Sequence, residues 1–378
     1  MKYNPEHFQP NVWQRITKII SSNRIGSAYL FSGPEGTGKE AAALAFSAAL
    51  NCQGNEIICG SCSSCVRFSS LQHEHLHVIV PLPRKKANFD KDTDVLSIIG
   101  DDNAALLTDL LQKKGTDPFQ KINIPRAKRI LINSIRELRK KLYLKSVDSG
   151  YKMVLIFDAH CLSDGDGASA NALLKLLEEP PKKTTVILVT DYKSMLLSTI
   201  QSRCQQIDFP PISHDIVSTY LTDRGIHSGE AEFYANLADG NIHKARFLAD
   251  RTVAEILKTM KDQVEAVVNS NGDGWRSYIN NMSRMVRSDP NNFKFHLFLL
   301  QTWFQQSVRF RQNISSPLAQ NGFEEALKTF TTSYPQANLT TANSVIETTI
   351  ASIDRNFYMP LTLTNMLIDI QHYLKGKA

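Results

Sequence analysis

The sequence predicts an α/β domain built on a parallel sheet, followed by a small helical domain and a larger all-helical one. Two observations place the sheet in the first half: short apolar runs alternate with helical stretches, and one run leads into a glycine-rich loop. A third places the helical domains, because strand signals stop after Pro210-Pro211. The predicted domains are 1–212, 213–250 and 251–378.

Strands of the first domain are expected where apolar residues run together between turn signals. These runs are 27–32, 77–81, 151–158 and 185–190. Helices are expected where apolar residues recur at helical spacing or where alanine is abundant, at 41–50, 130–143 and 168–179. Strands that alternate with helices favour parallel pairing. The polar stretch at about 82–121 is predicted to be an irregular surface insertion.

Composition excludes several classes of protein. With 42% apolar and 21% charged residues, the chain can bury several cores. No run approaches the roughly 18–20 apolar residues of a membrane helix, and the N-terminal MKYNPEHFQP lacks the apolar core of a signal peptide, so a cytoplasmic protein without a membrane partner is expected. The formal net charge of +6 is uneven, because residues 121–145 carry nine Lys or Arg and one Glu.

Four of the six cysteines fall close together with the spacing C-x6-C-x2-C-x2-C: Cys52, Cys59, Cys62 and Cys65. In a reducing compartment this pattern disfavours disulfides and suits four thiolates around zinc. Four thiolates leave no position open for water, so the predicted site is a structural zinc module at about 51–70. The alternative is four unliganded thiols in a turn-rich loop. The remaining two, Cys161 and Cys204, are expected to pack as small apolar residues.

A phosphate-binding loop is predicted at 33–39, where G-x-x-x-x-G-K lies between a strand and a helix. Backbone N–H groups around Gly33, Gly36 and Gly38 can face phosphate oxygens, and Lys39 can place a cation beside the β and γ phosphates. The next position, where a Ser or Thr hydroxyl would hold Mg²⁺, is Glu40. A carboxylate at this position adds repulsion against phosphate unless it reaches the metal itself.

The strand 151–158 ends at Asp158, which could hold Mg²⁺. An ATPase would follow this Asp with a Glu that orients the attacking water, whereas this chain has Ala159 and then His160. Loss of a catalytic base typically removes about 10²–10⁴-fold of rate. Two positions therefore lack the groups that hydrolysis needs, which predicts a nucleotide-binding scaffold with little or no ATPase activity.

In this order, the motifs resemble those of the bacterial clamp-loader AAA+ subunits of DNA polymerase III, which are the gamma/tau ATPase and the delta-prime subunit. The resemblance covers about residues 10–250 and includes YKMVLIFDAH, ANALLKLLEEPP and the SRC motif at 202–204. It implies an AAA+ P-loop domain with an inserted zinc module, a helical lid at 213–250 and a helical collar at 251–378. The 82–121 stretch is longer than the family pattern.

The resemblance also assigns roles by position. Arg203 of the SRC motif would reach in trans to the γ-phosphate of ATP on a neighbouring subunit, and Thr190 would take the sensor-1 position. His243 stands where active members carry the sensor-2 arginine, a third departure after Glu40 and Ala159. The departures favour the delta-prime type of subunit, which lends an arginine finger but does not hydrolyse ATP, with or without bound ATP or ADP. Without the resemblance, Arg203 is a surface arginine.

The implied partners are gamma/tau ATPase subunits, a delta subunit, the sliding clamp and primer–template DNA, within a cytoplasmic hetero-oligomer that loads the clamp in DNA replication. Arg136, Arg139 and Lys140 lie at helical spacing, on a segment that resembles the family helix facing the central chamber of the loader, which makes them the candidates for DNA binding. Two or three of them could follow the phosphates of one strand without reading sequence. The alternative for these charges is a solvated helix face.

Two other functions stay open on the sequence. An active gamma/tau-like ATPase would need Glu40 and a displaced acid, such as Asp164 or Asp166, to substitute for the missing groups. A different P-loop protein such as a nucleotide kinase is disfavoured by the cysteine cluster and by the helical last third of the chain.

Overall fold

The computed structural model describes residues 4–84, 93–143, 150–163, 165, 167–269, 272–314, 318, 322–353 and 357–376. The chain divides into two compact units. One comprises Met1–Val217 with Asp239–Lys244, and the other comprises Ser218–Ala238 with Ala245–Ala378. The boundaries expected at 212 and 250 stay predictions. The short segment Asp239–Lys244 packs with the first unit, although the helix before it belongs to the second unit and its last three residues begin a helix that continues into that unit.

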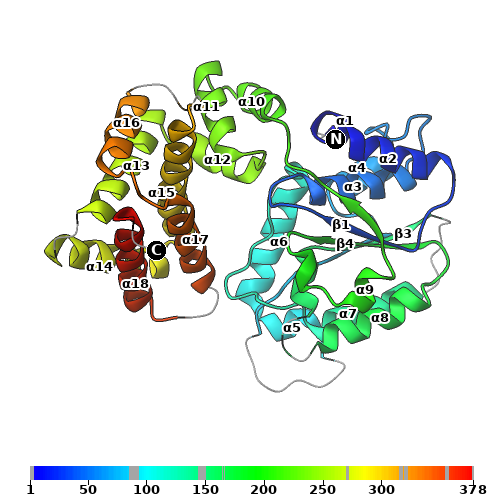
Figure 1. Cartoon of the computed structure of the whole chain (residues 1–378). Coiled ribbons are helices and arrows are strands. Elements are labelled where there is room, and N and C mark those ends of the chain that lie inside the picture. Colours follow the sequence, from blue (N-terminus) through cyan, green and yellow to red (C-terminus); the bar gives the residue numbers. More distant parts are fainter. Residues whose placement is uncertain are drawn as a thin grey trace. The chain divides into compact units, whose positions relative to one another are not determined.

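A five-stranded parallel sheet forms the centre of the first unit, in the order β2-β3-β4-β1-β5 (Figure 1). Its strands are β1 (Ala28–Ser32), β2 (Leu76–Ile79), β3 (Lys152–Ile156), β4 (Thr184–Thr190) and β5 (Gln205–Asp208). Every residue of β1 and β4 is buried, as expected for strands with helices on both faces. The predicted parallel sheet is confirmed. The edge strand β5 was not predicted from the sequence, because its residues, QQID, are mostly polar.

Helices cover both faces of the sheet (Figure 1). One layer contains α1 (Pro5–Phe8), α2 (Pro10–Ser21), α3 (Lys39–Leu50) and α4 (Ser63–Ser69). The other contains α7 (Ile132–Tyr143), α8 (Ala168–Glu178), α9 (Ser198–Gln201) and the 3-10 turn η1 (Ala159–Leu162). A second 3-10 turn, η2, spans Lys193–Met195.

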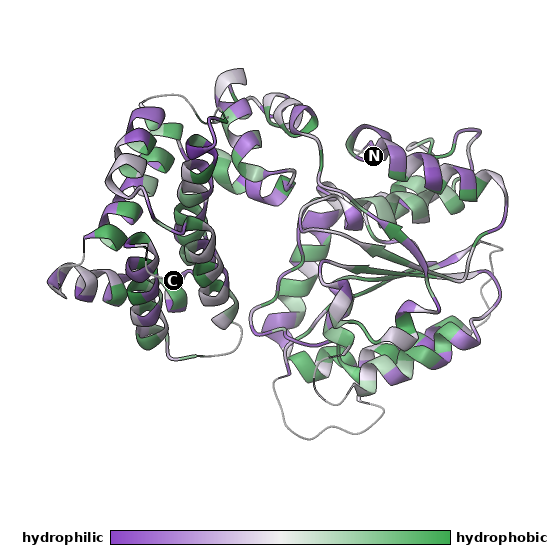
Figure 2. Ribbon diagram, viewed as in Figure 1, coloured by the Kyte–Doolittle hydropathy of each residue, from purple (hydrophilic) through white to green (hydrophobic). Residues whose placement is uncertain are grey.

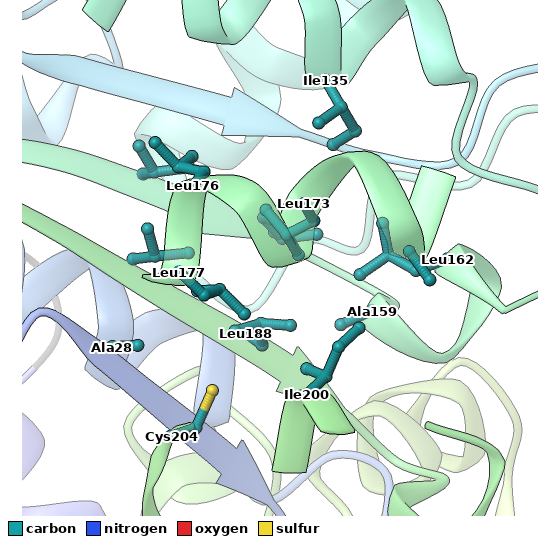
Figure 3. Close-up of a cluster of buried hydrophobic side chains, with 14 of the residues drawn as sticks. Ala28, Ile135, Ala159, Leu162, Leu173, Leu176, Leu177, Leu188, Ile200 and Cys204 are labelled. Carbon is teal, nitrogen blue, oxygen red and sulfur yellow. The ribbon is translucent and has the colours of Figure 1, made fainter. Parts of the chain in front are cut away.

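The core between the sheet and the second helical layer is continuous. Ile135 of α7, Leu173 and Leu176 of α8 and Ile200 of α9 gather with Leu188 of β4 (Figure 3). Figure 2 shows the same pattern along whole elements, with hydrophobic strands and polar outer helix surfaces. Burial of this cluster fixes the ends of β3 and β4, where the functional side chains lie.

The insertion 82–121 is not an irregular surface stretch in its described part, so this expectation is wrong. It forms α5 (Val95–Ile99) and α6 (Asp101–Thr116). The side chain of Asp94 accepts hydrogen bonds from the first N–H groups of α5, and Gly100 separates the two helices at a φ of 78°. Lys114 of α6 is fully buried. The insertion is therefore part of the fold and reaches the interior of the first unit.

The described residues of the second unit that lie in regular structure are helical. Beginning with α10 (His214–Thr222), which crosses from the first unit, they form α11 (Ser228–Ala238), α12 (Ile242–Ala249), α13 (Val253–Val268), α14 (Gly272–Ser288), α15 (Pro290–Arg311), α16 (Phe323–Ser333), α17 (Leu339–Ser352) and α18 (Met359–Leu374). The long α15 packs against α13, α14, α16 and α17 through buried side chains such as Phe293, Leu300 and Phe304, and its Phe295 ring also meets Phe247 of α12. No helix among the described residues has the length and hydropathy that crossing a membrane requires.

Candidate functional site

The phosphate loop joins β1 to α3, as the motif predicts. Gly36 and Gly38 have φ values of 73° and 82°, in the left-handed region that favours glycine. A Cβ on Gly36 would lie 1.9 Å from the side-chain oxygen of Asn241, so only glycine permits this approach. The backbone N–H of Ile242 also donates a hydrogen bond to the Gly36 carbonyl at 3.1 Å. The segment Asp239–Lys244 is thereby attached directly to the loop.

Lys39 points its ammonium group at oxygens of the chain itself. Its side chain is 4% exposed, and Nζ lies 2.7 Å from Oδ1 of Asp191, just after β4. Nζ also donates to the carbonyl oxygens of Gly33, at 2.9 Å, and of Pro34. Burial lowers the pKa of Lys39, and the neighbouring Asp191 carboxylate opposes that change. The cation that the motif predicts for phosphate is engaged in an internal ion pair.

Glu40 forms an ion pair with the buried Lys114 of the insertion. Lys114 Nζ also donates to the carbonyl oxygens of Gln120, at 2.7 Å, and of Pro118, at 3.2 Å. Burial alone would raise the pKa of Glu40, but Lys114 and Lys121 together hold it below its usual value. The carboxylate at the expected Ser/Thr position is therefore neutralised from inside the protein, which the sequence did not predict.

Asp158 follows β3 in the left-handed conformation, with a φ of 47°. Lys121 lies beside it: the Nζ atom is 3.6 Å from Oδ1 of Asp158, 3.3 Å from Oδ2 of Asp191 and 3.6 Å from Oε1 of Glu35. Burial raises the pKa of Asp158 to about 6, against the lowering effect of Lys121. The space left among these side chains is about 20 Å³ for the centre of a water-sized sphere, room for about one or two water molecules.

The AAA+ fold implies a magnesium ion with the nucleotide, and these residues do not fit it. Mg²⁺ requires oxygen ligands at about 2.0–2.1 Å in nearly octahedral geometry. Here the candidate ligands already form ion pairs with ammonium groups. Lys121 lies beside Asp158 and Asp191, and Lys114 pairs with Glu40. The acids Asp164 and Asp166, named as possible substitutes in an active ATPase, lie outside the described residues.

Thr190 ends β4, where the sensor-1 position was expected. Its hydroxyl oxygen lies 3.2 Å from Nδ1 of His160 and accepts a hydrogen bond from the backbone N–H of Tyr192 at 3.0 Å. The sequence reasoning missed the pairing of Thr190 with His160. His243 lines the same pocket, and burial lowers the pKa of its imidazole.

The four cysteines come together as predicted. Their Sγ atoms all lie within 4.8 Å of one another, close to the roughly 3.8 Å expected for thiolates at tetrahedral corners 2.3 Å from zinc. Backbone N–H groups point at the sulfurs: that of Cys62 donates to Cys59 at 3.4 Å, and that of Cys65 donates to Cys62 at 3.4 Å. Hydrogen bonding, chiefly from Cys62, lowers the pKa of Cys59 to about 6. The donor set and its spacing fit a structural zinc ion.

Arg203 lies just after α9 on the surface of the first unit. Its side chain is 37% exposed, and Nη2 lies 2.7 Å from Oε1 of Glu178, at the end of α8. Nη1 donates to the carbonyl oxygen of Thr199 at 2.9 Å. The guanidinium is held by local partners and remains accessible from solvent. Cys204, the next residue, is buried in the core, as its predicted packing role requires.

The basic helix α7 borders a cavity of about 430 Å³. Three arginines line it, Arg84, Arg129 and Arg136, together with the first residues of α7 and α8. Helix N-termini and arginines both favour anions.

Of the three residues expected to bind DNA, Arg136 lines this cavity, whereas Arg139 is half-buried and Lys140 is exposed elsewhere on α7. Sequence reasoning missed Arg84 and Arg129: Arg129 directly precedes the predicted helix, whereas Arg84 is far from it in the sequence. Lys145, at the end of the basic run, lies outside the described residues.

Comparisons with known proteins agree with this geometry. A family model described as DNA polymerase III, delta subunit, matches residues 8–213. The DNA polymerase III subunit delta' of Bacillus subtilis is 31% identical over 232 residues, which cover 61% of this chain and 56% of that protein. The tau subunit of the same organism is 29% identical over 272 residues, covering 68% of this chain and 40% of that protein. The chain thus spans about half the length of the curated relatives it matches.

Among solved structures, a DNA polymerase III gamma subunit-related protein of Thermotoga maritima aligns with 96% of this chain and 99% of its own, at 15% identity and a TM-score of 0.39. The matched residues 8–213 contain the phosphate loop, the cysteine module and Arg203. The expected AAA+ class of fold, with a parallel sheet, an inserted cysteine module and C-terminal helices, is confirmed. The chain therefore belongs to the DNA polymerase III, delta subunit family of clamp-loader proteins.

Proposed function

We propose that this chain is the delta-prime subunit of a DNA polymerase III clamp loader. In this role it helps to load the sliding clamp onto primed DNA and lends Arg203 to a neighbouring ATPase subunit, without hydrolysing ATP itself. The observation that carries the proposal is a contrast between two cations. Lys39 is 4% exposed and paired with Asp191, whereas Arg203 is 37% exposed at the surface.

The setting of Arg203 suits a finger that acts in trans. An exposed ion pair such as that with Glu178 contributes about 0–1 kcal/mol, so exchanging this carboxylate for a phosphate on another subunit costs little. A guanidinium supplied to developing phosphoryl charge is worth about 10³–10⁵ in rate in other nucleotide hydrolases. The position after α9 also fixes the backbone, because the N–H groups of Arg203 and Cys204 donate to Ile200 and Gln201.

The chain's own pocket supports the non-hydrolysing half of the proposal. Ala159 stands where an ATPase places its water-orienting Glu, and a methyl group cannot polarise water. His243 stands in place of the sensor-2 arginine, and burial lowers its pKa, which favours the neutral imidazole. Whether or not ATP or ADP enters, these residues offer no base for its hydrolysis.

The proposed partners are gamma/tau ATPase subunits, a delta subunit, the sliding clamp and primer–template DNA. The delta' and tau relatives support assembly with other clamp-loader subunits. The cavity beside α7 supports contact with a phosphate backbone, because three arginines and the first residues of two helices line it. Residues 213–250 are proposed as the lid and 251–378 as the collar through which subunits assemble.

Arg203→Ala tests the proposal in a loader reconstituted from this chain, the gamma/tau ATPase and the delta subunit, with clamp and primed DNA. We expect ATP turnover of the loader to fall, because the catalytic site that faces this chain loses a group worth about 10³–10⁵ in rate at that site. The matched control is Arg67→Ala, since Arg67 forms an equally exposed ion pair with Glu74 at 2.8 Å on the cysteine module. Turnover that tolerates Arg203→Ala rejects the finger, and brisk turnover by the isolated wild-type chain indicates an active gamma/tau-like ATPase instead.

A further inference from the structure

We infer that Lys114 and Lys121, both supplied by the insertion 82–121, take the place of the magnesium ion in the phosphate-loop pocket, so that this pocket admits neither a divalent cation nor a magnesium–nucleotide complex. The inference deepens the proposed function and rests on it in one respect: a pocket that does not hydrolyse ATP has no need of the metal. It adds a role for a stretch of chain that is longer than the family pattern.

Lys121 stands at the position that the metal would need. Its Nζ atom lies within 3.6 Å of carboxylate oxygens from Asp158, Asp191 and Glu35, which come from three separate segments of the sheet unit. Asp158 is the strand-end acid that the motif assigns to Mg²⁺. One ammonium group therefore makes the charge contacts through which a divalent ion would join these strands.

Lys114 makes the second substitution. The hydroxyl that would complete the magnesium site is replaced by Glu40, and Lys114 neutralises this carboxylate from within the protein. Lys114 is fully buried, and its remaining hydrogen bonds go to the carbonyl oxygens of Gln120 and Pro118. A buried ammonium without a counter-charge is strongly unfavourable. Release of Glu40 to a metal would leave such a group behind.

The insertion is anchored, so that neither lysine is free to swing out. A Cβ on Gly115 would lie 3.1 Å from the carbonyl oxygen of Ser69, which shows how closely the end of α6 approaches the end of α4. Phe119, between the two lysines, packs edge-on against Phe8 of α1 with ring centroids 4.9 Å apart. These contacts hold the backbone on both sides of Lys114 and lead directly to Lys121.

Lys39 completes a network of charges within the pocket. Three ammonium groups, of Lys39, Lys114 and Lys121, face the carboxylates of Glu35, Glu40, Asp158 and Asp191. A nucleotide phosphate would have to displace Asp191 from Lys39 and would then add negative charge to a site that already holds more acids than bases. Where Lys39 would meet a phosphate, its ammonium group already contacts Asp191 and the carbonyl oxygens of Gly33 and Pro34.

Manganese binding tests the inference on the full, zinc-loaded chain. Mn²⁺ reports on magnesium sites by electron paramagnetic resonance and prefers oxygen ligands, so it does not compete for the four thiolates. We expect no saturable Mn²⁺ binding by the wild type, with or without ATP. Lys121→Met should uncover Asp158 and Asp191 and raise Mn²⁺ affinity by about tenfold or more, since a nearby cation shifts carboxylate affinities by about 1–3 logarithmic units.

Two further variants make the result specific. Adding Asp191→Asn to Lys121→Met should remove the gained Mn²⁺ site, whereas Lys128→Met, which changes an exposed lysine of the same segment, should behave as the wild type. Tight Mn²⁺–ATP binding by the wild type, or no gain in Lys121→Met, overturns the inference. Neither result affects the proposed role of Arg203, which is tested separately by the ATP turnover of the assembled loader.

A second measurement needs no variant and covers the case in which Lys121→Met fails to fold. Lysine reactivity toward an acylating reagent, read by mass spectrometry, reports which ammonium groups are accessible. In the wild type we expect Lys114 to be unreactive, Lys128 to be reactive, and the reactivity of Lys121 to be unchanged by millimolar Mg²⁺–ATP. A change at Lys121 on addition of Mg²⁺–ATP shows that the complex displaces it and overturns the inference.

Discussion

The Nη2 atom of Arg203 lies 2.7 Å from Oε1 of Glu178, so the proposed arginine finger has a carboxylate partner within its own subunit. Both side chains are substantially exposed, at 37% and 49%. An exposed pair of this kind contributes little to stability. If Arg203 acts in trans as proposed, Glu178 is the partner that a neighbouring subunit's phosphate has to replace.

Glu178→Ala is expected to leave the free energy of unfolding within about 1 kcal/mol of the wild type, because the ion pair is exposed. In the reconstituted loader we expect ATP turnover equal to or above that of the wild type, since Arg203 no longer has to leave a partner. Urea titration and steady-state turnover measure the two effects. A loss of turnover as large as that of Arg203→Ala would instead make Glu178 a residue that positions the finger.

Lys114→Met is expected to lower the free energy of unfolding by about 3–5 kcal/mol, because it leaves the Glu40 carboxylate without its buried partner. Lys114→Met combined with Glu40→Thr should regain most of that loss, since both members of the pair are then gone. The neighbouring Lys113→Met is the control: Lys113 is exposed and pairs with Asp109 one turn away, so about 0.5 kcal/mol is expected. Additive losses in the double variant would show that the two side chains do not interact.

Cys59→Ser is expected to abolish zinc binding and to lower the thermal midpoint of unfolding, because a structural zinc ion stabilises only the folded chain. Elemental analysis of the purified protein should give one zinc per wild-type chain and none for the variant. Cys161→Ala, outside the cluster, should retain the ion. A wild-type chain without zinc after purification in zinc-supplemented medium contradicts the assignment.

Stability should depend on the protonation of His77, which is partly buried on the edge strand β2. Burial, with Lys141 and Lys152 nearby, lowers the pKa of His77 to about 4. The unfolded chain therefore binds a proton between pH 6.5 and 4 that the folded chain does not, and stability falls as the pH falls through this window. Asp158, whose pKa is raised to about 6, acts in the opposite sense between pH 6 and 4.

His77→Gln isolates the histidine contribution. The variant should lose less stability than the wild type when the pH is lowered from 7 to 5, by about 1–2 kcal/mol, given 1.36 kcal/mol for each unit of pKa difference. Urea titrations at the two pH values measure the difference, with the exposed His227→Gln as the matched control. Equal pH dependence in His77→Gln and the wild type means that His77 is not held neutral by the fold.

Arg136→Glu is expected to weaken binding of the assembled loader to primer–template DNA. The slope of log K against log salt concentration should also fall by about one, because one phosphate contact is lost. The same change at Lys258, exposed on α13, should have little effect. Fluorescence anisotropy over a series of salt concentrations gives both quantities. An unchanged affinity and salt slope for Arg136→Glu together would exclude the cavity beside α7 as a DNA contact.

Much of the first unit could be predicted from the sequence because its signals are local. The runs that form β1, β3 and β4 are continuously apolar, and the loop that ends at Lys39 requires glycines at fixed positions. The cysteine spacing likewise brings four ligands together over a short length of chain. In each case the residues that specify the structure are neighbours in the sequence.

The remaining features depend on contacts between distant residues. Strand β5 is polar and gains its place only by pairing with β1. Lys114 is an ordinary helical lysine by sequence, and its burial follows from a partner 74 residues away, Glu40. Lys121 is the first residue of the basic run in which the DNA-binding residues were expected. Its side chain nevertheless lies among the acids of the phosphate loop. A charge pattern predicts that lysines are present but does not predict which acids they will meet.

The backbone hydrogen bond from Ile242 to Gly36 joins two segments that are far apart in the sequence. A rearrangement of the glycine loop would have to break this bond or carry Asp239–Lys244 along with it. The loop is thereby braced by peptide groups of the same chain, independently of any phosphate.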